Sequence, residues 1–204
     1  MLPGSLWKPR LHWLLTGFQF WATHAAIVRG RVLAERGQYE EGIARMQQGL
    51  AAYRATGAEM TRTSYLAQLA EVYGAVEQPE EGCSLIAEAL SVVDDTSERA
   101  FEAELYRLKG ELTLQSKVES GKSKEEEAEA CFLKAIEIAL RQQAKSLELR
   151  AATSLARLWR QQGKRVEARQ MLADVYNWFT EGFDTKDLQE ARALLSELGQ
   201  NAEI

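Results

Sequence analysis

Apolar residues along the chain recur at spacings of three and four residues, which is the periodicity of amphipathic α-helices. Short breaks separate the periodic segments. Gly37, Gly57 and Gly163 stand where helices are expected to end, and Pro79 suits a first helical position. The predicted helices span about residues 18–36, 39–56, 60–76, 79–94, 100–115, 124–141, 147–162, 165–179 and 186–198. The pattern therefore predicts an all-α chain.

The predicted helices fall into pairs whose sequences repeat. Each first helix has a small residue, and these recur at 40, 40 and 46 residues: Gly30, Ala70, Gly110 and Ala156. Each second helix has a small residue and, four positions later, a bulky one: Gly42 and Met46, Gly82 and Ile86, Ala128 and Phe132, Ala168 and Leu172. These small residues recur at 40, 46 and 40, so one insertion of six residues between Gly110 and Ala128 accounts for both series. Such a period is typical of helical repeat proteins, whose insertions fall in loops.

The small and bulky residues have a packing role. Paired helices lie about 8–10 Å apart, and Gly or Ala at the crossing lets the backbones approach while the bulky residue fills the adjacent space. Since one pair cannot bury its apolar face alone, neighbouring pairs are expected to stack into a superhelix. A ninth helix would cap the last pair with an apolar stripe of Leu188, Ala191, Leu194, Leu195 and Leu198. We expect an irregular lead-in over residues 1–17, a repeat domain of four helix pairs and a cap over 18–198, and a tail over 199–204.

The repeat resembles a known family. The order of small, aromatic, small, bulky and small residues at Ala70, Tyr73, Gly82, Ile86 and Ala89 is similar to the tetratricopeptide repeat, whose usual period is about 34 residues. Residues 102–115, 127–164 and 167–195 further resemble the C-terminal repeat region of bacterial signalling proteins that join a class III adenylate/guanylate cyclase or another effector to a P-loop ATPase module. The resemblance covers about residues 18–198. It implies a regulatory, protein-binding region, with a cyclase or ATPase domain as a candidate partner.

Charge and composition narrow the classes of function. The 204-residue chain has 46% hydrophobic and 27% charged residues and a net charge of −5, with both signs interspersed. A nucleic-acid module would have a basic face, and no apolar run reaches the roughly 18 residues that span a bilayer, so neither nucleic acid nor membrane is an expected partner. Cys83 and Cys131 are too few for a secreted disulfide scaffold. Residues 6–21 lack a clean export signal, because His12 and Gly17 interrupt the apolar stretch, so a cytoplasmic location is expected.

Gly121-Lys122-Ser123 matches the end of a phosphate-binding loop. The full motif needs a glycine five positions before Gly121, where Ser116 stands, and a preceding β-strand, where a helix is predicted. Ser123 is instead a suitable N-cap, with Glu126 completing a capping box. The glutamates of this first turn would also repel a phosphate group. We therefore expect a helix start, and a nucleotide-binding module that uses residues 116–123 stays an alternative.

Catalytic and metal-binding chemistry have little support in the sequence. The two histidines and two cysteines are not arranged at metal-ligand spacings, and both histidines lie in the first 24 residues, far from any later nucleophile. Carboxylate pairs such as Glu40 and Glu41 recur in the first turn of a second helix, where they complement the helix dipole. The sequence predicts a protein that is not an enzyme and needs no cofactor or metal.

The remaining candidate is the side of each first helix that lines the concave face in tetratricopeptide-like repeats. The side chains predicted to face a partner there are Arg31, Glu71, Arg107, Glu111, Arg150, Arg157 and Arg160. They form a mixed face that becomes basic towards its C-terminal end, and guanidinium groups pair well with carboxylates. We expect this face to bind an acidic peptide or a neighbouring protein domain. The alternatives are a solvated helix face without a partner, and a self-associating fragment that uses its first helix as the contact.

Overall fold

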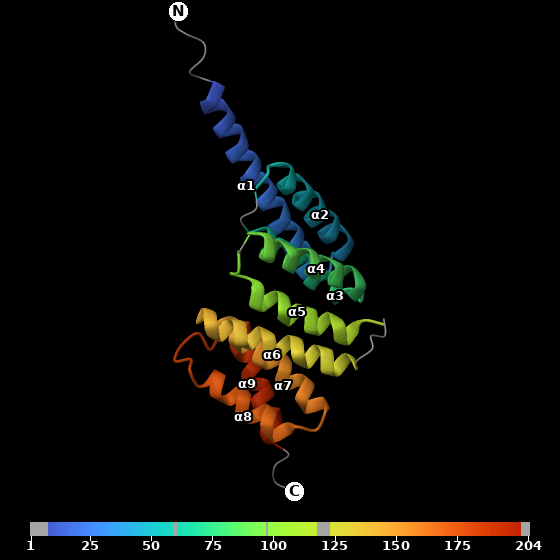
Figure 1. Ribbon diagram of the computed structural model, residues 1–204, viewed down its shortest axis with the longest axis vertical. Helices are drawn as coiled ribbons and strands as arrows, with labels where there is room; N and C mark the ends of the chain where they lie inside the picture. Colours follow the sequence, from blue (N-terminus) through green and yellow to red (C-terminus); the bar gives the residue numbers. More distant parts are fainter. Residues whose placement is uncertain (1–7, 59–60, 97, 118–122, 201–204) are drawn as a thin grey trace, which may run out of the picture. The chain divides into compact units, whose positions relative to one another are not determined.

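The structure is a computed structural model that describes residues 8–58, 61–96, 98–117 and 123–200, with residues 8–19 described by their backbone. Its helices are α1 (Lys8–Glu35), α2 (Tyr39–Ala55), α3 (Arg62–Ala75), α4 (Pro79–Thr96), α5 (Glu102–Gln115), α6 (Lys124–Gln142), α7 (Lys145–Gln161), α8 (Arg165–Tyr176) and α9 (Lys186–Gly199) (Figure 1). All regular secondary structure in the described residues is helical. The all-α prediction is therefore confirmed.

The helices are distributed over two compact units. Unit 1, residues 1–98, contains α1 to α4, and unit 2, residues 99–204, contains α5 to α9. In unit 1, α1 packs against α2 and α3 packs against α4; in unit 2, α5 packs against α6, α7 against α8, and α9 against both α7 and α8. These contacts confirm the four helix pairs and the additional C-terminal helix. The stacking of all four pairs into one superhelix over residues 18–198 stays a prediction.

Helix α1 begins earlier than the sequence pattern predicted. It starts at Lys8, whereas residues 1–17 were expected to be an irregular lead-in. Residues 1–7 of that lead-in lie outside the described part of the chain. The physical reason is that Leu11, Leu14 and Phe18 continue the helical spacing across Gly17, and Pro9 falls in the first turn, where a missing N–H costs no hydrogen bond. One glycine was not enough to end the helix.

The predicted small residues allow close backbone contact within the pairs. A Cβ atom added at Gly30 of α1 would lie 2.7 Å from the carbonyl oxygen of Gly42, and one added at Gly42 would lie 2.7 Å from the carbonyl oxygen of Gly30. In the third pair, a Cβ atom at Gly110 of α5 would lie 2.6 Å from Cε1 of Phe132. The crossing of α1 and α2 is therefore backbone against backbone, and that of α5 and α6 is backbone against a ring. Both confirm the packing role predicted from the repeat.

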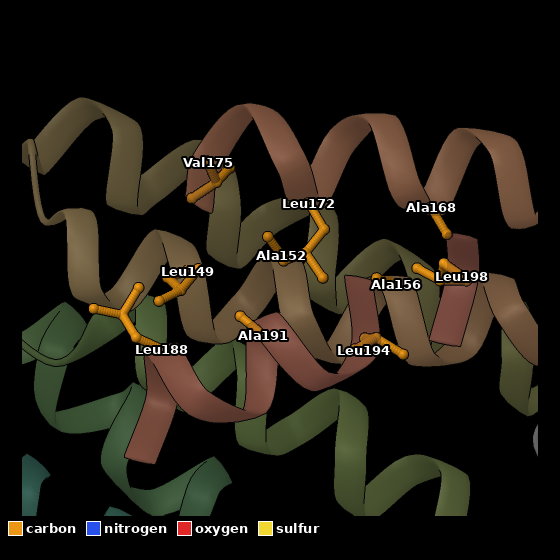
Figure 2. Close-up of a cluster of buried hydrophobic side chains, with 10 residues drawn as sticks. All are labelled: Leu149, Ala152, Ala156, Ala168, Leu172, Val175, Leu188, Ala191, Leu194 and Leu198. Atoms are coloured by element: carbon orange, nitrogen blue, oxygen red, sulfur yellow. The ribbon is translucent and has the colours of Figure 1, made fainter. Parts of the chain in front are cut away.

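The core of unit 2 shows how α9 closes the last pair. Figure 2 shows the buried side chains of α7, α8 and α9 directed towards one another. The cluster consists of Leu149, Ala152, Ala156, Ala168, Leu172, Val175, Leu188, Ala191, Leu194 and Leu198, with Leu195 partly buried against it. The stripe predicted for the ninth helix is thus the surface that contacts the pair. A second cluster joins Ala128 and Phe132 of α6 to Leu155 and Leu158 of α7.

The start of α6 agrees with the capping interpretation of the Gly-Lys-Ser sequence. The hydroxyl of Ser123 accepts a hydrogen bond from the backbone N–H of Glu126 at 3.1 Å, and Glu125, Glu126 and Glu127 occupy the first turn. Gly121 and Lys122 lie outside the described residues. Because the Ser123 hydroxyl caps the helix and three carboxylates follow it, this segment favours a helix start over a phosphate site.

Candidate protein-interaction surfaces

The predicted residues of unit 1 pair with each other across neighbouring first helices. Nη1 of Arg31 on α1 lies 2.7 Å from Oε2 of Glu71 on α3, and Nε of Arg31 lies 2.9 Å from Oε1 of Glu35. Nη1 also donates to the carbonyl of Gln68 at 3.3 Å. Burial lowers the pKa of Arg31, but the hydrogen bonds and charges of Glu71 and Glu35 outweigh it and raise the pKa above its ordinary value. These contacts link α1 to α3.

In unit 2, Arg107 lies inside a charged network. Its side chain is 7% exposed; Nη2 and Nε donate to the two carboxylate oxygens of Glu104 at 2.7 and 2.9 Å, and Nη1 lies 2.6 Å from Oε1 of Glu111. From α7, Nη2 of Arg150 approaches Glu104 to 3.0 Å and the hydroxyl of Ser154 donates to Glu111 at 2.7 Å. Burial lowers the pKa of Arg107, but Glu104 and Glu111 outweigh it and raise the pKa. The network joins α5 to α7, and Arg107 is too buried to face a partner.

The three predicted arginine residues of α7 are half-exposed and lie beside carboxylates of α9. Nη2 of Arg157 donates to Oε2 of Glu190 at 2.6 Å, and Nε of Arg150 lies 3.9 Å from Oδ1 of Asp187. Arg160 forms an ion pair with Glu197. We call Arg150, Arg157 and Arg160 the arginine row. The basic end expected from the sequence is therefore matched by three acidic side chains of the capping helix.

Glu190 gives this contact a defined pH dependence. Burial raises the pKa of Glu190, but Arg157 first, with Lys186 and Arg150, outweighs it and holds the pKa below the ordinary value of 4.5. The ionised carboxylate of Glu190 therefore stabilises unit 2 fully above pH 4.5, and this stabilisation is lost as the pH falls through the lowered pKa.

We expect Glu190→Gln to destabilise unit 2 at pH 7. The difference in the free energy of unfolding between this variant and wild type should narrow at acidic pH. Urea unfolding at several pH values measures this, with Glu181→Gln in the exposed loop before α9 as a control. A difference in the free energy of unfolding between wild type and Glu190→Gln that does not change with pH would contradict this prediction.

The described residues offer no cluster suited to a metal ion. No group of three or more His, Cys, Asp or Glu side chains among them could hold one. Nδ1 of His24 lies 2.6 Å from the hydroxyl of Tyr65, so this imidazole joins α1 to α3. The side chain of His12 is outside the described part. No helix among the described residues is both long and apolar enough to cross a membrane.

The fold is similar to solved structures of helical repeats. Two crystal structures of nearly identical TPR-like repeats, from a Podospora anserina protein described as a putative kinesin light chain, share 18% sequence identity with the chain. Each match covers 86% of this chain and 84% of the other, with a TM-score of 0.63 for a variant with one substitution and 0.62 for the second structure. No protein family model and no curated protein matches the chain. The chain therefore has an all-helical, tetratricopeptide-like repeat fold.

Proposed function

We propose that the chain is a non-catalytic protein-interaction module whose arginine row binds an acidic segment of another protein. The observation that carries this proposal is the half-exposed position of the three guanidinium groups along one side of α7. Nη2 of Arg157 donates to Glu190, and a guanidinium group has five N–H donors, enough to receive a second carboxylate. The ion pairs with α9 fix the orientation of these donors before a partner arrives, which lowers the entropic cost of binding.

Exchange of carboxylates is energetically feasible at this surface. Partly exposed ion pairs stabilise a folded protein by only about 0–1 kcal/mol each. An incoming carboxylate can therefore replace Glu190 or Glu197 without unfolding α9, whose buried leucine residues hold it on α7 and α8. The buried Arg107 and the mutually paired Arg31 and Glu71 serve the packing of their own units. The proposed site is thus narrower than the sequence alone predicted.

The sequence resemblance supports a context for this activity. Residues 102–115, 127–164 and 167–195 resemble the repeat regions of bacterial signalling proteins that contain a cyclase or ATPase domain. On that basis the module is a regulatory region of such a system, and a domain or acidic segment of the same system is its partner.

A charge swap tests the proposal without removing the internal ion pair. Arg157→Glu with Glu190→Arg keeps opposite charges facing each other at this contact but reverses the charge presented by α7. We expect affinity capture from lysate, quantified by mass spectrometry, to retain a partner on wild type and at least about ten-fold less on the swapped variant, since a lost charged pair costs about 1.4 kcal/mol or more.

The matched control is the swap of Arg45 and Glu41 on α2, which lie 3.8 Å apart and are 42% and 56% exposed. This variant should retain the same partner as wild type, and circular dichroism should show native helix content for both swaps. Equal capture by the Arg157/Glu190 swap would contradict a site on the arginine row. Absence of any specifically retained protein would contradict the interaction function itself.

A further inference from the structure

Three carboxylates of α9 lie beside the arginine row and cancel its charge. We call Asp187, Glu190 and Glu197 the α9 carboxylates, and each of them forms an ion pair with one member of the row. Three formal positive charges therefore face three formal negative charges. An acidic protein at a distance is consequently attracted less by this surface than it would be by three unmatched arginine residues.

The α9 carboxylates stay at this surface whether or not they are paired. Helix α9 is held on α7 and α8 by its buried side chains, which Figure 2 shows directed into the core cluster of unit 2. Glu190 and Glu197 are 39% and 56% exposed, so each can turn towards water once another carboxylate has taken its arginine. A group attached in this way acts at an effective concentration on the order of millimolar or above. Any acidic ligand of the arginine row therefore competes with α9.

The buried ion pair of the same unit behaves differently. The side chains of Arg107 and Glu104 are both 7% exposed and are joined by two hydrogen bonds. Their separation would leave an uncompensated buried charge, so an incoming carboxylate cannot exchange with Glu104. Arg157 and Glu190, in contrast, are 41% and 39% exposed and open to water on both sides of the pair. Exchange of carboxylates is therefore a property of the contact between α7 and α9.

The spacing of the arginine row sets the length of a ligand that can win this competition. Arg150, Arg157 and Arg160 are separated by seven and three residues, which corresponds to about 15 Å along α7 from the first to the last. An extended chain advances about 3.3 Å per residue, so a run of about five or six residues spans the row. One carboxylate gains little, because it replaces a carboxylate of the same charge. Several carboxylates on one segment gain more, since the binding of the first brings the others close to their arginine residues.

From this geometry we propose that the α9 carboxylates are an internal competitor of the arginine row, and that they restrict the row to ligands with a run of about five or six acidic residues. The inference rests on the proposed function, because it concerns the same site, and it adds the regulation of that site and the class of segment that binds there. A protein segment with an isolated carboxylate is kept out by α9. A change that neutralises the α9 carboxylates opens the row to weaker acidic ligands.

A peptide of six glutamate residues labelled with a fluorophore is a suitable probe. It is titrated with the full wild-type chain and with the double variant Glu190→Gln/Glu197→Gln. Glutamine keeps an oxygen that accepts a hydrogen bond, so the arginine residues stay oriented while the competing charges are lost. Fluorescence anisotropy should show binding at least about ten-fold tighter for the double variant than for wild type, because two charged pairs no longer have to be broken. Glu197→Gln alone, at the more exposed position, should give part of this gain.

The matched control removes the same net charge elsewhere. Glu40→Gln/Glu41→Gln changes two exposed carboxylates of α2 and should bind the hexaglutamate peptide as wild type does. A second peptide with one glutamate among glycine and serine residues should bind wild type at least about ten-fold more weakly than hexaglutamate does. Circular dichroism should show native helix content for both double variants.

The outcomes separate this inference from the proposed function. If wild type and Glu190→Gln/Glu197→Gln bind hexaglutamate equally, and Arg157→Glu weakens both, the internal competitor is overturned while the site on the arginine row stands. Equal binding of the two peptides by wild type would overturn the requirement for an acidic run. Tighter binding that persists after Arg157→Glu is added to the double variant, or absence of binding by every form of the chain, would overturn both the competitor and the site.

Discussion

Replacement of Arg107 by alanine is expected to lower the free energy of unfolding of unit 2 by about 3 kcal/mol, the lower end of the usual cost of breaking a buried ion pair, because Glu104 keeps its contact with Arg150 at 3.0 Å. Glu104 would lose both of its hydrogen bonds to Arg107, at 2.7 and 2.9 Å, while staying buried with a side chain that is 7% exposed. Glu111 would lose the contact of 2.6 Å. Urea unfolding of the full chain, followed by circular dichroism, measures the change.

Two further variants separate the network from a general effect of losing an arginine. Arg107→Lys keeps the charge but cannot donate to both oxygens of Glu104 in the same plane, so an intermediate loss is expected. Arg45→Ala on α2 removes an arginine that is 42% exposed and whose partner Glu41 is 56% exposed, and it should change stability by less than about 1 kcal/mol. If Arg107→Ala were as mild as Arg45→Ala, the network would be dispensable and the link between α5 and α7 would rest on apolar contacts alone.

The repeat period predicted the helices because small residues are required at fixed places. Small residues recur at the repeat positions of Gly30 and Gly42 because the backbones of the paired helices lie in contact there. The six-residue insertion falls in the break between α5 and α6, as the spacing predicted. The start of α1 was predicted wrongly, because residues 1–17 lie outside the repeat and were therefore expected to be irregular, although the apolar spacing continues on both sides of Gly17. The division into two units at Glu98 and Arg99 has no counterpart in the repeat, which passes through that point without a change of period.

Which residues bind a partner stays a prediction, and the ion pairs that surround the predicted residues could not be read from the repeat. The repeat frame identified which residues of α7 share a side, but the charge of that side also depends on α9, which lies about 30 residues further along the chain. Asp187, Glu190 and Glu197 are spaced so that they meet the arginine row, a pattern visible in the sequence only once α9 is known to pack on α7. The burial of Arg107 could not be predicted from the repeat either, because a position on a first helix can face either a binding partner or the neighbouring first helix.

Truncation of Phe132 to alanine is expected to destabilise unit 2 by about 3–5 kcal/mol, the usual cost of removing a buried aromatic ring. The ring is 1% exposed and packs with Ala128, Leu155 and Leu158, so its loss opens a cavity between α6 and α7. It also lies against the backbone of α5 at Gly110, where an added Cβ atom would be 2.6 Å from Cε1. Urea unfolding measures the loss in the free energy of unfolding. A loss below about 1 kcal/mol would contradict the prediction and show that neighbouring side chains fill the space of the ring.

The contact between Gly110 and the ring of Phe132 allows the pairing of a small residue with a bulky one to be measured as a coupling free energy between two substitutions. Gly110→Ala alone should destabilise unit 2 by about 1–3 kcal/mol, because the ring of Phe132 must move. In the Phe132→Ala background the same substitution should be neutral or stabilising by up to about 1 kcal/mol, since the space is open and alanine favours the helix. Gly199→Ala, where the nearest atom is Nε of Arg169 at 3.7 Å, is the control and should add to Phe132→Ala without coupling. Additive effects of Gly110→Ala and Phe132→Ala on the free energy of unfolding would mean that the ring of Phe132 is not the reason why position 110 requires a small residue.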